Sequence, residues 1–427
     1  MLGVPALAAI AVFVGAYVLF VFRERHQLLI AGVAALAVMG LGLVSVSSLL
    51  PTGWSGRGGV VEWDTLGLLL GLFLFAGTLR ELGLFRRIAR RLARRLSGRP
   101  LGMFLALSIA SFVLSAFLNS ISVLLVVATV TLELASEAGL DPIPLLLAEV
   151  AASNAGGAAT FVGDPPNVIL GTYFQLSFGD FLLHTALPAI AALAVILVIF
   201  SRTFRTASPP PPPTAVTERE SPEPRWGVGI ALAGFAGMLL VLAVQGPLGV
   251  PIWVIGLVGG ALALALAGRT HAPNVLRHFD WPTLAFFVFL FVLVGSLVQT
   301  GVIGSLAGGL TSAGGGNLLL TGSLLLWSLG LLSSLVNNVP LAAAAAPLIA
   351  AIGTGSGLPV RPLVWATALG TDLGGSGTPI GASANVVGLA VYRKAGITVT
   401  WRQYLRTAFP VMLATLAAAN LVWLVLR

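Results

Sequence analysis

The most constraining feature of this chain is an internal repeat that contains two interrupted apolar segments. Residues 154–168 read NAGGAATFVGDPPNV, and residues 372–386 read DLGGSGTPIGASANV. At an offset of 218 the two segments share glycine, threonine, asparagine and valine at six positions. In the first copy these are Gly156, Gly157, Thr160, Gly163, Asn167 and Val168. Interrupted hydrophobic segments at corresponding places in two halves indicate the binding site of a secondary transporter.

The composition requires a membrane protein. The chain is 57% hydrophobic and 9% charged, whereas soluble domains are about 25% charged. Apolar runs of about 20 residues, long enough to cross a bilayer, recur along the whole length. The first of them, residues 2–22, lacks the basic leader and the cleavage site of a signal peptide, so we interpret it as a permanent span.

Several function classes are disfavoured by the same composition. The chain has no cysteine, and its four histidines show no metal-ligand spacing, so we expect no metal site of that kind and no cofactor. A membrane-embedded enzyme would need a nucleophile–base pair or a metal cluster, and the sequence offers neither. The net charge of +8 could suggest nucleic acid, but the basic residues lie between membrane segments.

The repeat divides the chain into an N-terminal half, 1–205, a proline-rich linker, 206–225, and a C-terminal half, 226–427. The fold class predicted is an all-α polytopic membrane protein with two inverted repeats, each with five spanning helices, one re-entrant hairpin and a broken helix. The segments expected in the first half are 5–22, 28–50, 65–85, the hairpin 101–118 with 121–139, the broken span 143–172, and 181–201. Those expected in the second half are 226–244, 248–268, 283–300, the hairpin 315–336 with 338–353, the broken span 360–391, and 407–426.

Charge decides the orientation. If each short helix pair is a hairpin and the N-terminus lies outside, 20 of the 23 basic residues become cytoplasmic, as the positive-inside rule requires. The connector 85–97 carries six arginines around an apolar stripe, whereas its counterpart, 304–317, carries no charge. We therefore expect inverted halves, both termini outside, the linker inside, and the connector lying in the inner headgroup layer of a prokaryotic inner membrane.

The chemistry is expected where the two hairpin tips and the two breaks meet. Broken helices expose backbone groups that are tolerated only against protein or a water-filled cavity, and half-helix ends hold ions there. The asparagines at the tips could also merely close turns, and the threonines could back-bond within a helix. The candidate substrate- or ion-binding residues are Asn119, Ser120, Ser122, Asn154, Thr160, Asp164, Asn167, Asn337, Asn338, Asp372, Thr378, Ser383 and Asn385.

Three carboxylates are candidate proton carriers. Asp372 comes just before the second break, where a buried charge costs about 2.5–3.5 kcal/mol on insertion scales and indicates function. Asp164 precedes two prolines, which suits a helix N-cap as well as an ion-binding carboxylate. Glu149 is expected two turns into its span, either as a proton relay or as a hydrogen-bonding partner of a neighbouring helix.

At these motifs the chain resembles the ion-transporter superfamily, in the branch with arsenite permeases, NhaD-type sodium/proton antiporters and the melanosomal P protein. The residues that carry the resemblance are 148–157, 163–167, 373–378 and 381–387. The resemblance implies a scaffold and a moving transport domain, that is, an elevator, an architecture shared with citrate-transporter-like sodium-coupled carboxylate carriers. Many members of the branch have Asp-Asn at the tips. Here the tips read Asn119-Ser120 and Asn337-Asn338, which argues against a simple transfer of sodium/proton antiport.

We therefore predict a secondary-active transporter of a small inorganic ion or oxyanion, linked to H⁺, with arsenite or antimonite efflux as the leading hypothesis. The alternatives are a sodium/proton antiporter, with Na⁺ at the tips and breaks, and a sodium-coupled di- or tricarboxylate transporter. A passive channel and a membrane-embedded enzyme are the rivals from other classes. The partners considered are membrane lipids, a second copy of the chain in a homodimer and, for arsenite efflux, a soluble ATPase; nucleic acid is not expected.

Overall fold

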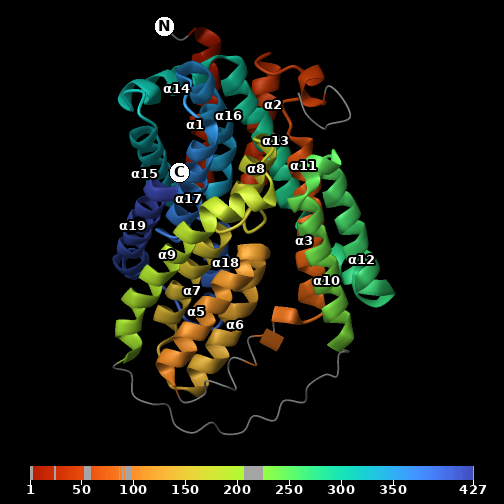
Figure 1. The fold of residues 1–427 in the computed structure, drawn as a ribbon, viewed down its shortest axis with the longest axis vertical. Coiled ribbons are helices and arrows are strands. Elements are labelled where there is room, and N and C mark those ends of the chain that lie inside the picture. Colours follow the sequence, from red (N-terminus) through yellow and green to blue (C-terminus); the bar gives the residue numbers. More distant parts are fainter. Residues whose placement is uncertain are drawn as a thin grey trace.

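The fold is seen in a computed structural model that describes residues 3–23, 26–51, 59–85, 87, 88, 91, 99–205 and 225–426. In this part of the chain every regular element is a helix, and ten helices are long and apolar enough to cross a membrane (Figure 1). The all-helical fold class is therefore confirmed. The linker and most of the arginine-rich connector lie outside the described residues.

The helices follow the predicted segments closely. The first repeat contains α1 (Val4–Phe22), α2 (Gln27–Gly40), the 3₁₀ turn η2 (Val46–Leu49), α3 (Trp63–Glu81), α5 (Pro100–Phe117), α6 (Ser120–Glu137), α7 (Pro142–Gly157), α8 (Pro165–Tyr173) and α9 (Phe178–Arg205). The second contains α10 (Arg225–Ala243), α11 (Gln245–Leu248), α12 (Ile252–Arg277), α13 (Trp281–Gln299), α14 (Val302–Ala313), α15 (Leu318–Leu335), α16 (Asn338–Ser356), α17 (Val360–Gly375), α18 (Ser383–Lys394) and α19 (Trp401–Leu426).

Helix packing shows that a two-fold relationship joins the repeats. α3 packs on α12, and their counterparts α13 and α2 pack on each other. In the same way α6 packs on α18 and α16 on α8, while α5 packs on α7 and α15 on α17. Such reciprocal contacts are what a two-fold axis produces. The chain starts α1 near the top of Figure 1 and α10 near the bottom, so the repeats run in opposite directions.

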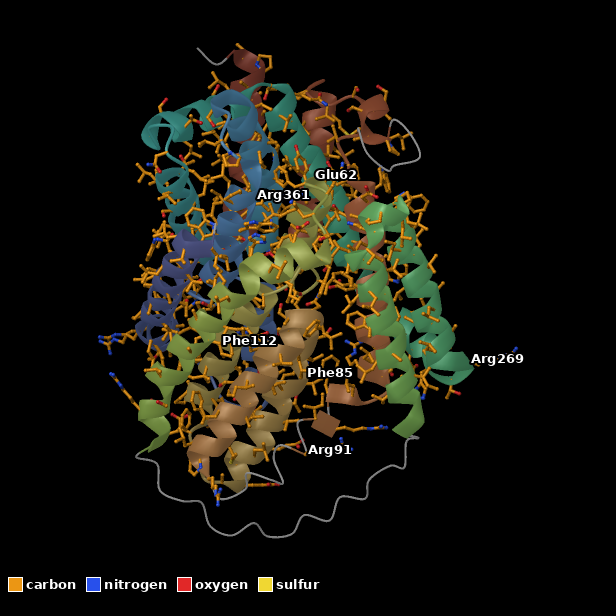
Figure 2. All side chains as sticks on the ribbon, in the orientation of Figure 1. Glu62, Phe85, Arg91, Phe112, Arg269 and Arg361 are labelled. Atoms are coloured by element: carbon orange, nitrogen blue, oxygen red, sulfur yellow. The ribbon has the colours of Figure 1, made fainter. Side chains whose placement is uncertain are left out.

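The helices form two outer groups and a core. One outer group contains α1, α2 and α13, and its two-fold counterpart contains α10, α12 and α3. The hairpins, the broken helices, and α9 with α19 pack together as the core, and the two outer groups contact each other through α3 and α13. Figure 2 shows Arg361 in the upper part of the molecule and Arg91 at its lower end.

Two predicted spans differ from the helices observed. In the segment 28–50 the α-helix ends at Gly40, because Gly42 takes a left-handed conformation (φ 68°), and only the 3₁₀ turn η2 follows. The segment 248–268 ends as a regular helix at Gly268, where φ is 67°, but helical turns continue to Arg277. Left-handed backbone is favourable for glycine and interrupts a right-handed helix.

Close helix packing positions the breaks. A Cβ atom on Gly156 would lie 2.1 Å from the carbonyl oxygen of Phe112, and one on Gly374 would lie 2.1 Å from that of Gly330. The first hairpin helix of each repeat therefore contacts the backbone of the broken helix directly. Only glycine permits this approach, which brings each tip beside its own break.

Candidate functional site

The two hairpin tips are closed by matching asparagine caps. The side-chain oxygen of Asn119 accepts the backbone N–H of Ile121 at 2.8 Å, and that of Asn337 accepts the N–H of Val339 at 3.1 Å. Both are N-caps of the returning helix, a position that favours asparagine. The turn-closing interpretation of these residues is thus correct for their oxygen atoms. The amide nitrogen of Asn337 also bonds the neighbouring break, where it donates to Ser383 Oγ at 2.8 Å.

The two breaks are braced by matching asparagines in the helices that follow them. Asn167 Nδ2 donates to the carbonyl oxygens of Gly157 and Thr160, each at 2.9 Å. Asn385 Nδ2 donates to those of Gly375 and Thr378, at 2.7 and 2.9 Å. The carbonyls of Gly157 and Gly375 end an interrupted helix and receive their donor from these amides, whereas those of Thr160 and Thr378 also accept the backbone N–H of Gly163 and Gly381.

Two threonines join each break to its own tip. The Thr160 hydroxyl donates to the carbonyl oxygen of Ala116, and the Thr378 hydroxyl donates to that of Ser334. The acceptors lie in the last turns of α5 and α15, just before the tips. The threonines therefore fix the tips on the breaks rather than back-bonding within their own segments.

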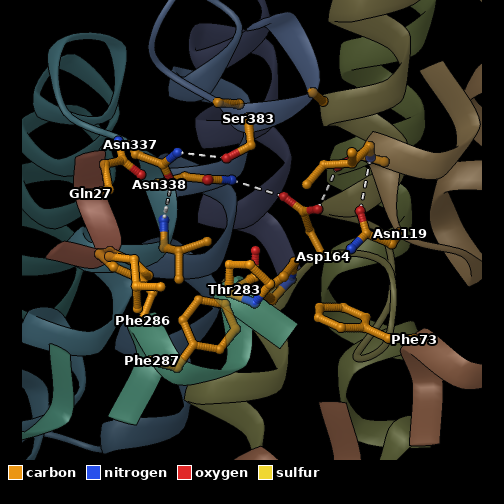
Figure 3. A pocket seen from close by; sticks show the side chains of 18 residues that line it. Gln27, Phe73, Asn119, Asp164, Thr283, Phe286, Phe287, Asn337, Asn338 and Ser383 are labelled. Atoms are coloured by element: carbon orange, nitrogen blue, oxygen red, sulfur yellow. Dashed lines mark hydrogen bonds between the residues drawn. The ribbon is translucent and has the colours of Figure 1, made fainter. Parts of the chain in front are cut away.

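A single cavity of about 200 Å³ brings both tips and both breaks together (Figure 3). Its polar lining includes Asn119, Ser120, Asp164, Asn337, Asn338 and Ser383. The outer helices contribute Gln27, Phe73, Thr283, Phe286 and Phe287. Six of the thirteen predicted binding residues therefore share one cavity, although they come from distant parts of the sequence.

Asp164 links the two repeats within this cavity. Its Oδ1 accepts the Ser120 hydroxyl at 2.6 Å, and its Oδ2 accepts the Asn338 amide at 2.9 Å (Figure 3). Asp164 precedes α8 but forms no side-chain cap on it. The helix-cap interpretation is thus wrong for the side chain, which binds one residue from each hairpin tip.

The electrostatic character of the cavity comes from helix ends. The N-terminal residues of α6, α8, α16 and α18 all line it. Each helix N-terminus is equivalent to about half a positive charge, so four together supply about two charges, against one negative charge on Asp164. Among the lining residues that the structure describes there is no lysine, arginine or histidine. The cavity can therefore attract an oxygen-rich solute without a basic side chain.

The other predicted residues lie outside the cavity lining. Asn154, Thr160, Asn167, Asp372, Thr378 and Asn385 are buried in and around the two breaks. Ser122 is half-buried on the first turn of α6. Asp372 is linked to the cavity through Asn338, whose amide donates to Asp372 Oδ1 at 3.3 Å.

Glu149 lies within α7 and is fully buried. Its Oε1 accepts the hydroxyl of Thr131 on α6 at 2.5 Å, whereas its Oε2 has no hydrogen-bond partner. The neighbouring-helix interpretation therefore accounts for one of its two oxygens. Among the described residues, no group of three or more histidine, cysteine, aspartate or glutamate side chains could hold a metal.

The outer-helix residues of the cavity were not predicted. For Thr283 the sequence contains one indication, namely that the same residue type, Thr65, stands at the corresponding position of the first repeat. No sequence pattern indicated the other four residues, Gln27, Phe73, Phe286 and Phe287. They line the cavity because of the way the outer helices pack against the core. Apolar aromatic residues in spanning segments are otherwise expected to contact lipid or neighbouring helices.

Known proteins resemble this chain over most of its length. The family model described as citrate transporter matches residues 17–370. An uncharacterized transporter of Mycobacterium tuberculosis is 34% identical, with 98% of each chain covered. The human P protein is 29% identical over 95% of this chain, which spans 58% of that protein. The structure of the YdaH transporter of Alcanivorax borkumensis, described as having an unusual topology, matches with a TM-score of 0.61 at 18% identity, covering 85% of both chains. The predicted resemblance to the ion-transporter superfamily is confirmed.

Proposed function

This chain belongs to the citrate transporter family, and we propose that it is a proton-linked, secondary-active transporter of a small, oxygen-rich solute. The observation that carries the proposal is the one cavity that the tips and breaks of both repeats share. A volume of about 200 Å³ corresponds to about seven water molecules, at about 30 Å³ each in the liquid. The site therefore suits a small solute rather than a large organic one.

Our leading substrate is arsenite or antimonite, carried outward as the neutral hydroxide. Such a solute presents hydroxyl groups that can donate to Asp164 and oxygens that can accept from the Asn119 amide, whose cap on α6 uses only its oxygen. Transfer of an uncharged solute requires no basic side chain, in agreement with the described lining. Binding by thiolate is excluded, because the sequence has no cysteine.

A di- or tricarboxylate is the second candidate, and a specific observation favours it. Four helix N-termini meet at the cavity, and the positive ends of their dipoles favour a negatively charged solute. Sodium/proton exchange has weaker support. Asp164 is the one carboxylate in the described lining, and the tip oxygens of Asn119 and Asn337 already accept backbone N–H groups.

The proposed mechanism is movement of the core relative to the two outer helix groups. The matched hydrogen bonds of tips and breaks would keep the core rigid, while the cavity lining combines core and outer residues that would separate. The cavity contains the first turns of α2 and α13. With the termini outside and the linker in the cytoplasm of a prokaryotic cell, both turns lie at the cytoplasmic face.

Flux into proteoliposomes tests the proposal. Arsenite, antimonite, citrate and sodium are offered with and without a pH gradient, and arsenite accumulation driven by the gradient is expected. The variant Asn337→Leu should abolish it. Asn420→Leu is the matched control, because Asn420 bonds Ser323 away from the cavity. Citrate flux without arsenite flux would select the second candidate, and absence of coupled flux for every solute would contradict the proposal.

A further inference from the structure

The two repeats are joined at their breaks by an amide–amide hydrogen bond. Asn154 Nδ2, near the end of α7, donates to Asn385 Oδ1, on α18, at 3.1 Å. Both side chains are at most 1% exposed. The Asn385 nitrogen is occupied by the two carbonyls of its own break. Its oxygen therefore depends on Asn154 as the donor from the other repeat.

The two-fold counterparts of Asn154 and Asn385 are Asp372 and Asn167. At the offset of 218, Asn154 corresponds to Asp372 and Asn385 to Asn167. The helices behave accordingly, because α17 packs on α8 as α7 packs on α18. The Asn167 nitrogen is likewise occupied by two carbonyls. One position of the pair has changed, from an amide to a carboxyl.

That change leaves two buried oxygens without partners. Asp372 Oδ2 and Asn167 Oδ1 both lack a hydrogen-bond partner, and both residues are 0% exposed. A buried acceptor without a donor is unfavourable, and few occur in native proteins. An ionised carboxylate only accepts hydrogen bonds, whereas a protonated carboxyl group also has an O–H donor. One proton on Asp372 Oδ2 therefore supplies the donor that the Asn154 amide supplies in the other half.

We propose that Asp372 is the proton-binding site, protonated at Oδ2, and that Asn167 Oδ1 accepts that proton's hydrogen bond. This inference rests on the proposed proton linkage and identifies its atoms. The other oxygen, Asp372 Oδ1, accepts from Asn338, which also donates to Asp164 in the cavity. Proton release would thus leave a negative charge on Asp372 and remove the hydrogen bond from Asp372 to Asn167. The change would reach the cavity through the Asn338 amide, which bonds both Asp372 and Asp164.

Other titratable groups near α17 are occupied elsewhere. Glu149 on α7 accepts from Thr131, and His184 on α9 bonds the carbonyl oxygen of Asp180. Tyr404 on α19 donates to the carbonyl oxygen of Ser376. Among the described hydrogen bonds, Asp164 is the titratable residue linked to Asp372, through Asn338.

Infrared spectroscopy of the protein in bilayers detects the proton without any transport. The wild type at neutral pH should show the carbonyl band of a buried carboxylic acid, shifted by carbon-13 labelling of the aspartate carboxyls. Asp372→Asn should remove that band and remain folded, because the new amide repeats the Asn154 arrangement. Glu149→Gln should retain it.

Each outcome bears on the site separately from the function. If Asp372→Asn does not fold, the labelled wild type still decides whether an aspartate is protonated. An aspartate-labelled sample with no shifted acid band, or a band that survives Asp372→Asn, would overturn the inference. A band at Asp372 together with failure of proton-driven flux would leave the proton site intact and contradict the proposed function instead.

Discussion

The hydroxyl of Tyr17 donates to the carbonyl oxygen of Pro340 at 2.6 Å, joining outer helix α1 to the first turn of α16. Its two-fold counterpart would pair residue 235 with Ser122, but residue 235 is phenylalanine and has no hydroxyl. The threonine bonds that hold tips to breaks occur as a matched pair, whereas this bond between outer helix and core does not. It therefore stabilises one arrangement of core and outer helices without an equivalent in the inverse arrangement.

A second hydrogen bond between an outer helix and the core also lacks a two-fold counterpart. The hydroxyls of Thr65 on α3 and Thr172 on α8 lie 2.5 Å apart. Their counterparts are Thr283 and Ala390, and alanine cannot form the bond. If the core moves as proposed, both pairs favour the arrangement described here.

The first prediction concerns this preference. Tyr17→Phe removes one hydrogen bond with a net value of about 0.5–1.5 kcal/mol, which should shift the balance of the two arrangements by about twofold to tenfold. The measurement is the labelling rate of a single cysteine at Ser383, in the cavity, by an impermeant thiol reagent added from the cytoplasmic side. Labelling should slow in the variant.

Tyr392→Phe is the matched control. Tyr392 also donates to a proline carbonyl, that of Pro142, at 3.0 Å, but α18 and α7 both belong to the core. It should lower stability by a similar amount and leave the labelling rate unchanged. Equal labelling effects from both variants would contradict a specific role for the Tyr17 bond.

A second prediction concerns the helix contacts beside the breaks. Gly156→Ala and Gly374→Ala place a Cβ atom 2.1 Å from a backbone carbonyl oxygen, so backbone must move. Overpacking of this kind costs typically about 1–3 kcal/mol or more, and thermal unfolding in detergent should occur at clearly lower temperature. Gly237→Ala on α10, where a Cβ atom has open space within 4 Å, should be neutral or slightly stabilising. Normal stability of both break variants would show that the helices can separate there.

The third prediction distinguishes asparagines that stabilise the breaks from an asparagine that binds the solute. Asn167→Leu and Asn385→Leu each remove an amide donor from two buried carbonyls. The threonine carbonyl of each pair also accepts a backbone N–H, so the glycine carbonyl is the one left unpaired, at about 1–3 kcal/mol. Both variants should lose thermal stability and expression together with transport. Asn337→Leu retains the break and should lose transport with a smaller change in stability. A stable, inactive Asn385→Leu protein would instead place Asn385 in solute binding.

The sequence predicted the architecture better than the contacts. Glycines, prolines and tip asparagines interrupt long apolar runs, so the hairpin tips at Asn119 and Asn337 and both breaks were predicted close to where they occur. Local patterns of this kind are strong because a helix must end where its backbone bonds stop. The partners of Asp164 lie 44 and 174 residues away, and no local pattern identifies them. The phenylalanines that line the cavity, Phe73, Phe286 and Phe287, are brought there by packing between distant helices and could not be predicted from the sequence either.

The final prediction assigns substrate affinity to Asp164 and proton coupling to Asp372. In Asp164→Asn one side-chain oxygen becomes an NH₂ group, which cannot accept from both Ser120 and Asn338, so the bridge between the tips is lost. We expect substrate affinity to fall by about tenfold, equivalent to about 1.4 kcal/mol, with the pH dependence of transport retained because Asp372 still binds the proton. Asp372→Asn should do the reverse: near-normal affinity with slow exchange that no longer responds to pH. Initial rates at several substrate concentrations across a pH series separate the two effects. Loss of pH dependence in Asp164→Asn alone would move the coupling proton from Asp372 into the cavity itself.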